Sequence, residues 1–450
     1  MGWFYRAAYD YKGKYLAEVN GRYDGTSRFP RGKRYGFFPS FSAAYRISEE
    51  AFFEPLRKTV DNLKIRLSYG SLGNQQIGYY DFIQTITTKG SMGDYSFDGT
   101  ILGQHATVSD PVSGNQTWEK VISKNLGADL NMFSNRLSLT ADFYIRDTKG
   151  ILGKGKSLPS IYGANEPQVN SNNLRTKGYE LVLGWRDSFK LAGSTFSYGI
   201  TGTFSDYTAE YTKCDNPSGL IGDPYVGKKY GEIWGYKVDG LFRNDEEAAE
   251  YASRVDLSKV AAGYYSATGA YGKGVRGGDI KYLDLDGSGI VDGGKGTLED
   301  PGDRRVIGNS SPRYQYGLTL NLSWYGFDLS VFMQGIGRLD WYPGADNLRF
   351  WGPYSRPYAT FIPKNFMSQV WSESNPDAYL PRARAYTSLN STQGTAYYTN
   401  DRYLQNLAYC RLKNLTLGYT IPKRLTSKVG IKECRVYFSC LLYTSPSPRD

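Results

Sequence analysis

The residue pattern with the clearest chemistry is an acidic, glycine-rich stretch near position 290. Its oxygen-bearing side chains are Asp284, Asp286, Ser288 and Asp292. Calcium binds several converging oxygen ligands, and glycine at the sixth position of its loops, here Gly289, allows a sharp turn. The twelfth position holds Lys295 in place of the bidentate glutamate of an EF-hand, so Asp300 or Asp303 would have to complete the shell. The stretch predicts either a calcium site or an Asp- and Gly-rich surface turn.

A second candidate site is a group of aromatic and basic side chains near position 350. Its members are Trp341, Tyr342, Arg349, Trp351 and Tyr354. Flat π faces and guanidinium groups suit sugar rings or peptide side chains at the mouth of a pore. The alternative is that these residues pack their loop onto a barrel or onto a partner protein.

Two glycine-rich stretches match nucleotide-binding spacings but lack the required context. Residues 150–157 fit the phosphate-binding P-loop, yet Leu158-Pro159-Ser160 follow where a helix is needed, so a loop is expected. Residues 272–277 fit G-x-G-x-x-G without a βαβ unit.

The single histidine, His105, lies in a polar stretch and offers little support for general-base chemistry. The sequence therefore predicts no catalytic residues and no enzyme.

The elements expected to carry these stretches are β-strands with one apolar and one polar face. Apolar and polar side chains alternate through residues 137–146 and 126–132, and the four residues 133–136 between them suit a tight turn. The same period recurs at 63–69, 179–185, 316–324 and 327–333, with a turn at Tyr325-Gly326. Roughly a dozen strands are more than one open twisted sheet holds comfortably, so a closed barrel or two packed sheets is expected.

Connection lengths favour an outer-membrane barrel, which has short turns on one side and long extracellular loops on the other. Tight turns near 134 and 325 alternate with long connections over residues 212–312 and 338–405, and Asp245–Val260 is the helix candidate in the first. No apolar run approaches the roughly 20 residues of a membrane helix. In a barrel strand only every second residue has to be apolar, which agrees with the low mean hydropathy of -0.50.

Composition supports the same class. The chain holds 40 Tyr, 21 Phe and 52 Gly, as expected for strands with aromatic girdles and turns. Its net charge of +10 is scattered, with no basic block of the kind that binds nucleic acid. Four cysteines without C-x-x-C spacing indicate neither a zinc site nor a disulfide scaffold.

Motifs along residues 1–440 resemble the SusC/RagA family of TonB-dependent outer-membrane receptors. In the first part they are KYL at 14–16, RYDGTSRF at 22–29, GFFPS at 36–40, ISEE at 47–50, LKIRLSYG at 63–70 and GN at 73–74. Further on they are NN at 172–173, TKGYE at 176–180, GDIKY at 278–282, IGN at 307–309, PRY at 312–314 and LKNLTLGY at 412–419.

The resemblance implies an all-β fold, a transmembrane antiparallel β-barrel with long extracellular loops. It implies that residues 1–440 are part of a 22-stranded barrel, without the plug domain, the TonB-contact segment and the first and last strands. Residues 441–450 abandon the alternation and resemble translated adapter sequence, so a non-native tail is expected there.

The resemblance also implies a function in the outer membrane. Members import oligosaccharides or peptides together with a SusD-like lipoprotein, using energy from the TonB complex through the plug. The expected partners are then outer-membrane lipid and an oligosaccharide or peptide, and no nucleic acid. No cofactor is expected apart from the calcium that the Asp-rich stretch could bind. Two alternatives stay open: a passive porin-like or structural barrel, and a secreted carbohydrate-binding β-protein that needs no detergent.

Overall fold

The computed structural model describes residues 1–90, 96–97, 100–101, 104–155, 158–265, 274–356, 358, 360, 362–384, 389 and 394–441. The chain divides into two compact units. The wall unit comprises residues 1–215, 313–337 and 409–450, and the loop unit comprises residues 216–312 and 338–408. Of the expected tail at 441–450, all but Leu441 lies outside the described residues.

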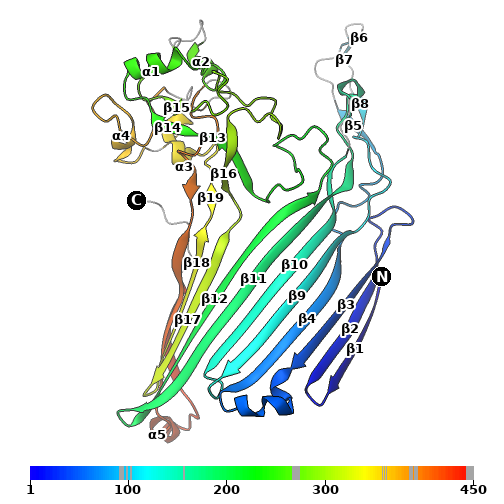
Figure 1. The fold of residues 1–450 in the computed structure, drawn as a ribbon, viewed down its shortest axis with the longest axis vertical. Coiled ribbons are helices and arrows are strands. Elements are labelled where there is room, and N and C mark those ends of the chain that lie inside the picture. Colours follow the sequence, from blue (N-terminus) through cyan, green and yellow to red (C-terminus); the bar gives the residue numbers. More distant parts are fainter. Residues whose placement is uncertain are drawn as a thin grey trace. The chain divides into compact units, whose positions relative to one another are not determined.

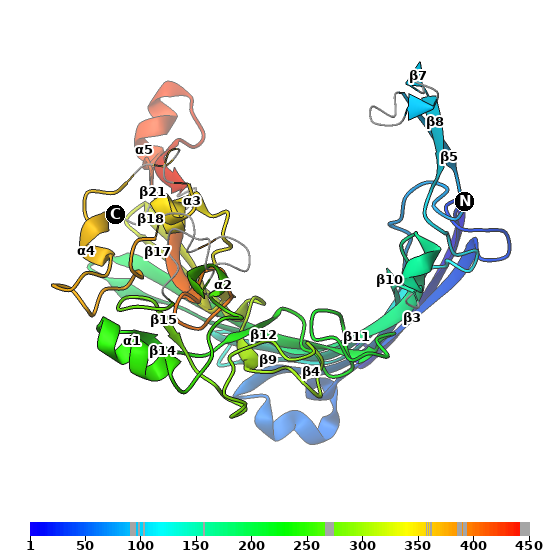
Figure 2. The same cartoon turned by 90° about the horizontal axis from the view of Figure 1, so that it is seen from above.

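The wall unit is one twelve-stranded antiparallel sheet (Figure 1). Its strands, in spatial order, are β1 (Gly2–Tyr11), β2 (Tyr15–Gly25), β3 (Tyr35–Arg46), β4 (Val60–Asn74), β9 (Glu119–Met132), β10 (Leu137–Lys154), β11 (Gln168–Leu191), β12 (Ser194–Lys213), β17 (Arg313–Trp324), β18 (Phe327–Arg338), β21 (Tyr409–Thr420) and β22 (Arg435–Leu441). Figure 2 shows that the strands follow a curved surface. The predicted all-β class and its antiparallel barrel strands are confirmed.

The shortest turns and the longest connections lie at opposite ends of these strands. The expected hairpin is present, with Met132 of β9 paired to Leu137 of β10 across residues 133–136. Tyr325 and Gly326 both have positive φ, 50° and 82°, as a two-residue type I′ hairpin turn requires. The opposite end carries the connections 75–118, 155–167, 214–312 and 339–408, so it is the extracellular end by the usual barrel rule.

Short helices and strands lie within the connections of the wall unit. They are η1 (Ile47–Glu49), η2 (Ala51–Leu56), β5 (Ile86–Gly90), β6 (Ser96–Phe97), β7 (Thr100–Ile101), β8 (Gln104–Val108), η3 (Ser160–Tyr162), α5 (Lys423–Thr426) and η5 (Ser427–Val429). None of the described helices has the length and hydropathy that a bilayer crossing needs.

The two faces of the sheet differ in polarity because side chains alternate along each strand and paired residues share a face. One register row contains Leu67, Leu126, Phe143 and Tyr179. The adjacent row, on the other face, contains Arg66, Gly127, Asp142 and Glu180. Large apolar side chains of the first face are about half exposed, with Phe143 at 56%. A face of this kind is stable where lipid covers it.

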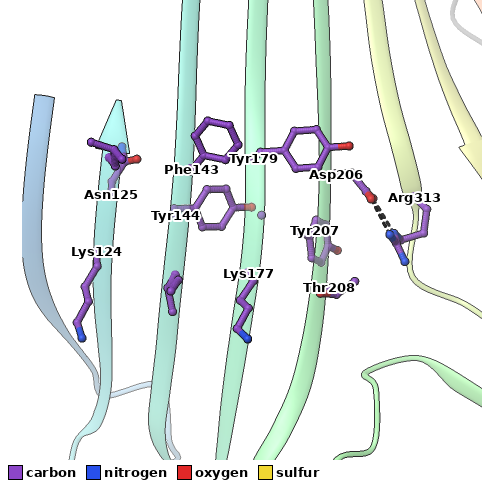
Figure 3. Close-up of a pocket in the computed structure, with 13 residues that line it drawn as sticks. Lys124, Asn125, Phe143, Tyr144, Lys177, Tyr179, Asp206, Tyr207, Thr208 and Arg313 are labelled. Carbon is purple, nitrogen blue, oxygen red and sulfur yellow. Dashed lines mark hydrogen bonds and ion pairs between the residues drawn. The ribbon is translucent and has the colours of Figure 1, made fainter. Parts of the chain in front are cut away.

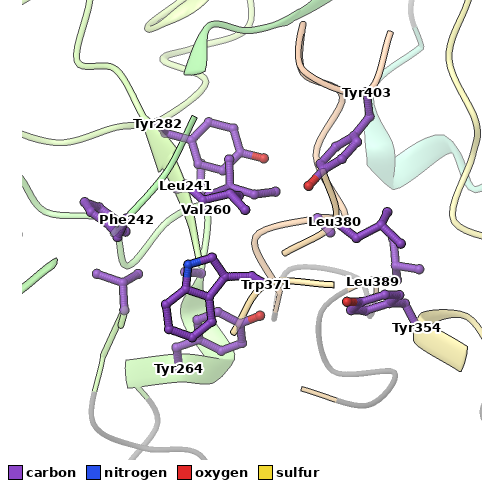
Figure 4. Packing of buried hydrophobic residues seen from close by; sticks show 14 of the residues in the cluster. Leu241, Phe242, Val260, Tyr264, Tyr282, Tyr354, Trp371, Leu380, Leu389 and Tyr403 are labelled. Atoms are coloured by element: carbon purple, nitrogen blue, oxygen red, sulfur yellow. The ribbon is translucent and has the colours of Figure 1, made fainter. Parts of the chain in front are cut away.

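The loop unit is built from short elements around a buried core. They are β13 (Glu232–Tyr236) with β16 (Arg304–Asn309), β14 (Val238–Leu241) with β15 (Ile280–Tyr282), β19 (Asp340–Trp341) with β20 (Gln405–Asn406), α1 (Asp245–Ala252), α2 (Ala262–Tyr265), α3 (Leu348–Trp351), η4 (Gly352–Tyr354) and α4 (Phe366–Gln369). The core is rich in aromatic side chains, among them Phe242, Tyr264, Tyr282, Trp371 and Tyr403 (Figure 4). This packing gives the two long connections a folded core of their own.

The predicted helix over Asp245–Val260 is real but half as long as expected. Asn244 caps α1 by accepting from the backbone N–H of Glu247 at 2.8 Å, and the Glu247 carboxylate accepts from the Arg243 N–H at 2.7 Å. Beyond Ala252, the Asp256 N–H donates to the Gly289 carbonyl at 2.7 Å. The second half of the predicted helix is therefore replaced by a segment whose backbone pairs with the Asp-rich loop.

Candidate transport wall and ligand sites

Charged side chains are tied into a network on the polar face of the sheet. Arg66 on β4 donates to both carboxylate oxygens of Asp129 on β9, at 2.9 and 3.1 Å. It also donates to both oxygens of Asp142 on β10, at 3.0 and 2.9 Å. Lys64 lies 2.9 Å from Asp129, and Asn125 donates to Asp142 at 2.9 Å. Such a charge-bearing face is typical of the inside of an outer-membrane barrel.

The network depends on one glycine. An ideal Cβ at Gly127 would lie 2.5 Å from Asp142 Oδ1 and 2.7 Å from the Arg66 guanidinium carbon. Because glycine has no side chain, the guanidinium lies across strand β9 and reaches the far carboxylate. Alternation predicted the polar face, but nothing in the sequence predicted which charges meet across three strands.

The Asp-rich stretch folds into a loop in which three carboxylates converge. Asp284, Asp286 and Asp303 each place an oxygen within 4.8 Å of the other two. Asp303 is one of the two residues predicted to complete the calcium shell, and the structure brings it into the group. The other two predicted ligands have contacts of their own within the loop: the Ser288 hydroxyl donates to the Ile290 carbonyl at 3.0 Å, and Asp292 Oδ1 accepts from the Gly294 N–H at 2.7 Å.

Asp303 organises this loop from a fully buried position. One oxygen accepts from the Leu285 N–H at 2.6 Å, and the other from the Asp292 N–H at 2.9 Å. Burial raises the pKa of Asp303, whereas backbone hydrogen bonding from Ser288 lowers the pKa of Asp286. A carboxylate oxygen has a second lone pair, so the three groups retain acceptor capacity toward a hard cation.

The five aromatic and basic residues proposed as a ligand surface divide into two groups. Trp351 is 0% exposed and donates from its ring N–H to the Pro343 carbonyl at 3.1 Å. Tyr354 is 2% exposed, and its hydroxyl donates to the Pro381 carbonyl at 2.6 Å. Tyr342 packs partly buried against the same core. Only Trp341, at 36% exposure, and the exposed Arg349 present their side chains to solvent.

The loop unit contains a cavity of about 570 Å³ that no sequence motif predicts. Its lining includes the aromatic residues Trp234, Tyr236 and Tyr398 and the charged residues Lys259, Asp292 and Arg304. Tyr236 and Tyr398 meet edge to face with ring centres 5.8 Å apart. These residues come from segments more than 150 positions apart, so no local motif marks the cavity.

A buried ion pair also had no sequence signal. Arg384 donates to Asp279 Oδ2 at 2.7 Å, and the carboxyl residue is only 1% exposed. The same oxygen accepts from the Arg276 N–H at 2.8 Å, while the Arg384 guanidinium carbon lies 4.1 Å from the centre of the Tyr264 ring. Burial raises the pKa of Asp279 to about 6.

The nucleotide-binding spacings have no matching fold in the described residues. Residues 151–154 continue strand β10, and Gly150 forms a bulge with a φ of 70°. Residues 156 and 157, the last two of the P-loop match, lie outside the described residues, as does Gly272 of the other match. The remaining glycines of that second match lie in a loop and not at a strand-to-helix turn.

The two-faced sheet, with long connections at one end, defines the wall of an outer-membrane β-barrel. No family model matches the chain. It is 26% identical over 450 residues to TonB-dependent receptor P3 of Formosa agariphila, covering 97% of this chain and 40% of that protein. It is 23% identical over 436 residues to TonB-dependent receptor SusC of Bacteroides thetaiotaomicron, covering 93% and 38%.

A solved structure of the RagAB peptide importer shares the fold. The TM-score is 0.69 at 20% identity, covering 97% of this chain and 43% of that one. The chain spans about two fifths of the length of the curated relatives it matches. The resemblance to SusC/RagA-type TonB-dependent receptors is confirmed, and with it the outer-membrane localisation.

Proposed function

We propose that the chain forms part of the wall and extracellular surface of an outer-membrane importer that takes up nutrient oligomers. The polar face of the sheet carries the proposal. A row of ionised, mutually hydrogen-bonded groups centred on Arg66 is stable only beside water, whereas the opposite face is apolar and suits lipid. A wall of this kind separates a hydrated path from the bilayer.

We further propose oligosaccharides as the nutrient, with peptides as the alternative. Exposed Trp341 and Arg349, and the aromatic cavity beside Tyr236, offer flat rings and hydrogen-bonding groups of the kind that bind sugars. Peptides enter as the alternative because the structurally similar RagAB complex is a peptide importer. A SusD-like lipoprotein and the TonB complex are the proposed partners, and the proposed role involves no catalysis by this chain.

The test is uptake by cells that express the full-length receptor containing this chain. Fluorescent oligosaccharides and oligopeptides of similar mass are supplied to cells with and without a proton-gradient uncoupler. Uptake that requires the receptor and stops with the uncoupler is the expected result. Receptor-dependent uptake that continues without energy would instead identify a passive pore. Recovery of the protein in the soluble, detergent-free fraction would identify a secreted binding protein.

Calcium at the Asp-rich loop is a separate proposal, supported by the convergence of Asp284, Asp286 and Asp303. Calorimetric titration of the full-length receptor with calcium tests it. Asp286→Asn, which alters the most exposed of the three, should weaken binding at least about tenfold, because affinity follows the number of charged ligands. Glu246→Gln on α1 removes the same charge elsewhere and should bind normally. Absence of heat at millimolar calcium contradicts the proposal.

A further inference from the structure

Four lysines gather on the apolar face of the sheet, at its extracellular margin. Lys124, Ile145 and Lys177 lie side by side in one register row across β9, β10 and β11. Lys120 and Lys149 pair with one another closer to the loops. On β10 the same face is apolar from Leu137 to Ile145. This stretch is about 27 Å long, and it spans about 21 Å of membrane thickness if the strand is tilted by about 40° from the membrane normal. The lysines therefore mark the upper limit of the lipid-facing band.

Two carboxylates on this part of the face already have basic partners. Asp147 binds Arg175 at 2.7 Å, and Asp206 is held by Arg313. Among the residues that the structure describes, neither Lys124 nor Lys177 lies within 4.0 Å of a carboxylate oxygen. Glu210, which is paired in register with Arg175, is the remaining acid nearby. The four lysines thus leave the margin with a net positive charge.

A hollow of about 580 Å³ joins two of these lysines to the apolar band below them. Its lining includes Lys124, Lys177, Phe143 and Tyr179. Figure 3 shows both lysine side chains running in the same direction along the strands, away from the two rings. Amphipathic side chains extend in this way when the stem lies in lipid and the ammonium group reaches the headgroup layer.

We propose that this hollow binds a phosphate-bearing lipid of the outer leaflet. The acyl chains lie on the apolar rows around Phe143, and Lys124 and Lys177 bind headgroup phosphate oxygens. These lysines are two strands apart, about 10 Å, so they reach separate phosphates or opposite sides of one large headgroup. The inference rests on the membrane-facing side of the sheet and not on the proposed import function.

Native mass spectrometry on the full-length receptor in detergent tests the proposal, with lipid A carrying two phosphates as the probe. Lys124→Gln/Lys177→Gln should weaken binding about 30-fold, which corresponds to ~2 kcal/mol for two lysine contacts. Lys58→Gln/Lys428→Gln removes two exposed lysines from the short-turn end and should bind normally. Lys124→Arg/Lys177→Arg should also bind normally.

The unaltered receptor provides a reading that does not depend on how the variants fold. The same lipid stripped of its phosphates should bind at least about tenfold more weakly, since the apolar contacts alone remain. Equal binding of the two lipids would overturn the proposal. So would equal binding by the double glutamine variant, and so would full displacement of the lipid by millimolar inorganic phosphate, which would point to a free-phosphate site.

Discussion

The guanidinium of Arg313 donates two hydrogen bonds, both 2.6 Å long, to the carboxylate of Asp206 on the neighbouring strand. Asp206 is 6% exposed and also accepts from the Tyr314 N–H at 3.2 Å. Tyr314 has a φ of 56°, a left-handed backbone that interrupts the regular strand beside the pair. This bidentate ion pair lies where the chain returns to the sheet after the loop unit.

Asp206→Asn should destabilise the barrel, because Arg313 then loses its charge-assisted partner. We expect the free energy of unfolding to fall by about 2 kcal/mol. Urea unfolding of the full-length receptor in detergent measures it. A double-mutant cycle with Arg313→Gln should give a coupling free energy of at least about 1 kcal/mol. Additive losses would show that the two side chains do not act together.

Gly127→Ala should disturb the polar face of the wall. The added methyl group would sit 2.5 Å from Asp142 Oδ1, so Arg66 must give up one of its two carboxylates. The same unfolding assay should show a loss of about 2 kcal/mol. Gly199→Ala on β12 is the matched control, since its Cβ would meet nothing nearer than 3.9 Å. Equal stability of both variants would contradict the close approach.

Trp351→Ala separates packing from ligand contact in the loop unit. Removing a fully buried indole should cost about 4 kcal/mol and make the loop unit sensitive to protease on intact cells. Trp341→Ala and Arg349→Ala alter exposed side chains and should leave protease resistance unchanged. Reduced uptake in these two variants at normal surface level would support their ligand role. Normal protease resistance of Trp351→Ala would contradict its packing role.

The stability of the loop unit should depend on pH through Asp279. Its pKa rises from 3.8 to about 6 on burial, so the folded state binds more protons than the unfolded state between these values. Stability therefore falls as the pH rises from about 4 to about 6, by roughly 3 kcal/mol in all. Hydrogen exchange of residues 278–282, corrected for intrinsic rates, should show this slope in the full-length receptor. Asp279→Asn should abolish it.

The strands of the wall unit could be predicted from the sequence because the alternation of apolar and polar side chains recurs in one strand after another. A period of two, visible in residues 137–146, fixes which side chains face lipid, and the Tyr325-Gly326 turn fixes a register. The helix over Asp245–Val260 was overestimated because helical composition continues past Ala252. In the structure the Asp256 N–H donates to the Gly289 carbonyl, a partner that local propensity does not reveal.

The candidate sites were less accessible to sequence reasoning. Spacing found Asp284 and Asp286, but it placed Asp292 in the same group, and the backbone turned that carboxylate toward Gly294. Aromatic content near position 350 gave no indication that Trp351 is buried and Trp341 exposed. Such differences arise from tertiary packing between segments distant in sequence, for which the chain carries no periodic signal.

The inserted loop unit has a consequence for the order of folding. Strands β12 and β17 pair directly, although residues 214–312 separate them. Within the loop unit, the Ser311 hydroxyl donates to the Tyr230 carbonyl at 2.9 Å, and the Ser310 N–H to the Gly231 carbonyl at 2.8 Å. Once these bonds form, the free loop between the strands shrinks from about 100 to about 20 residues. Closing it then costs about 1.4 kcal/mol less. The segment that separates the two strands in sequence thereby helps them to meet.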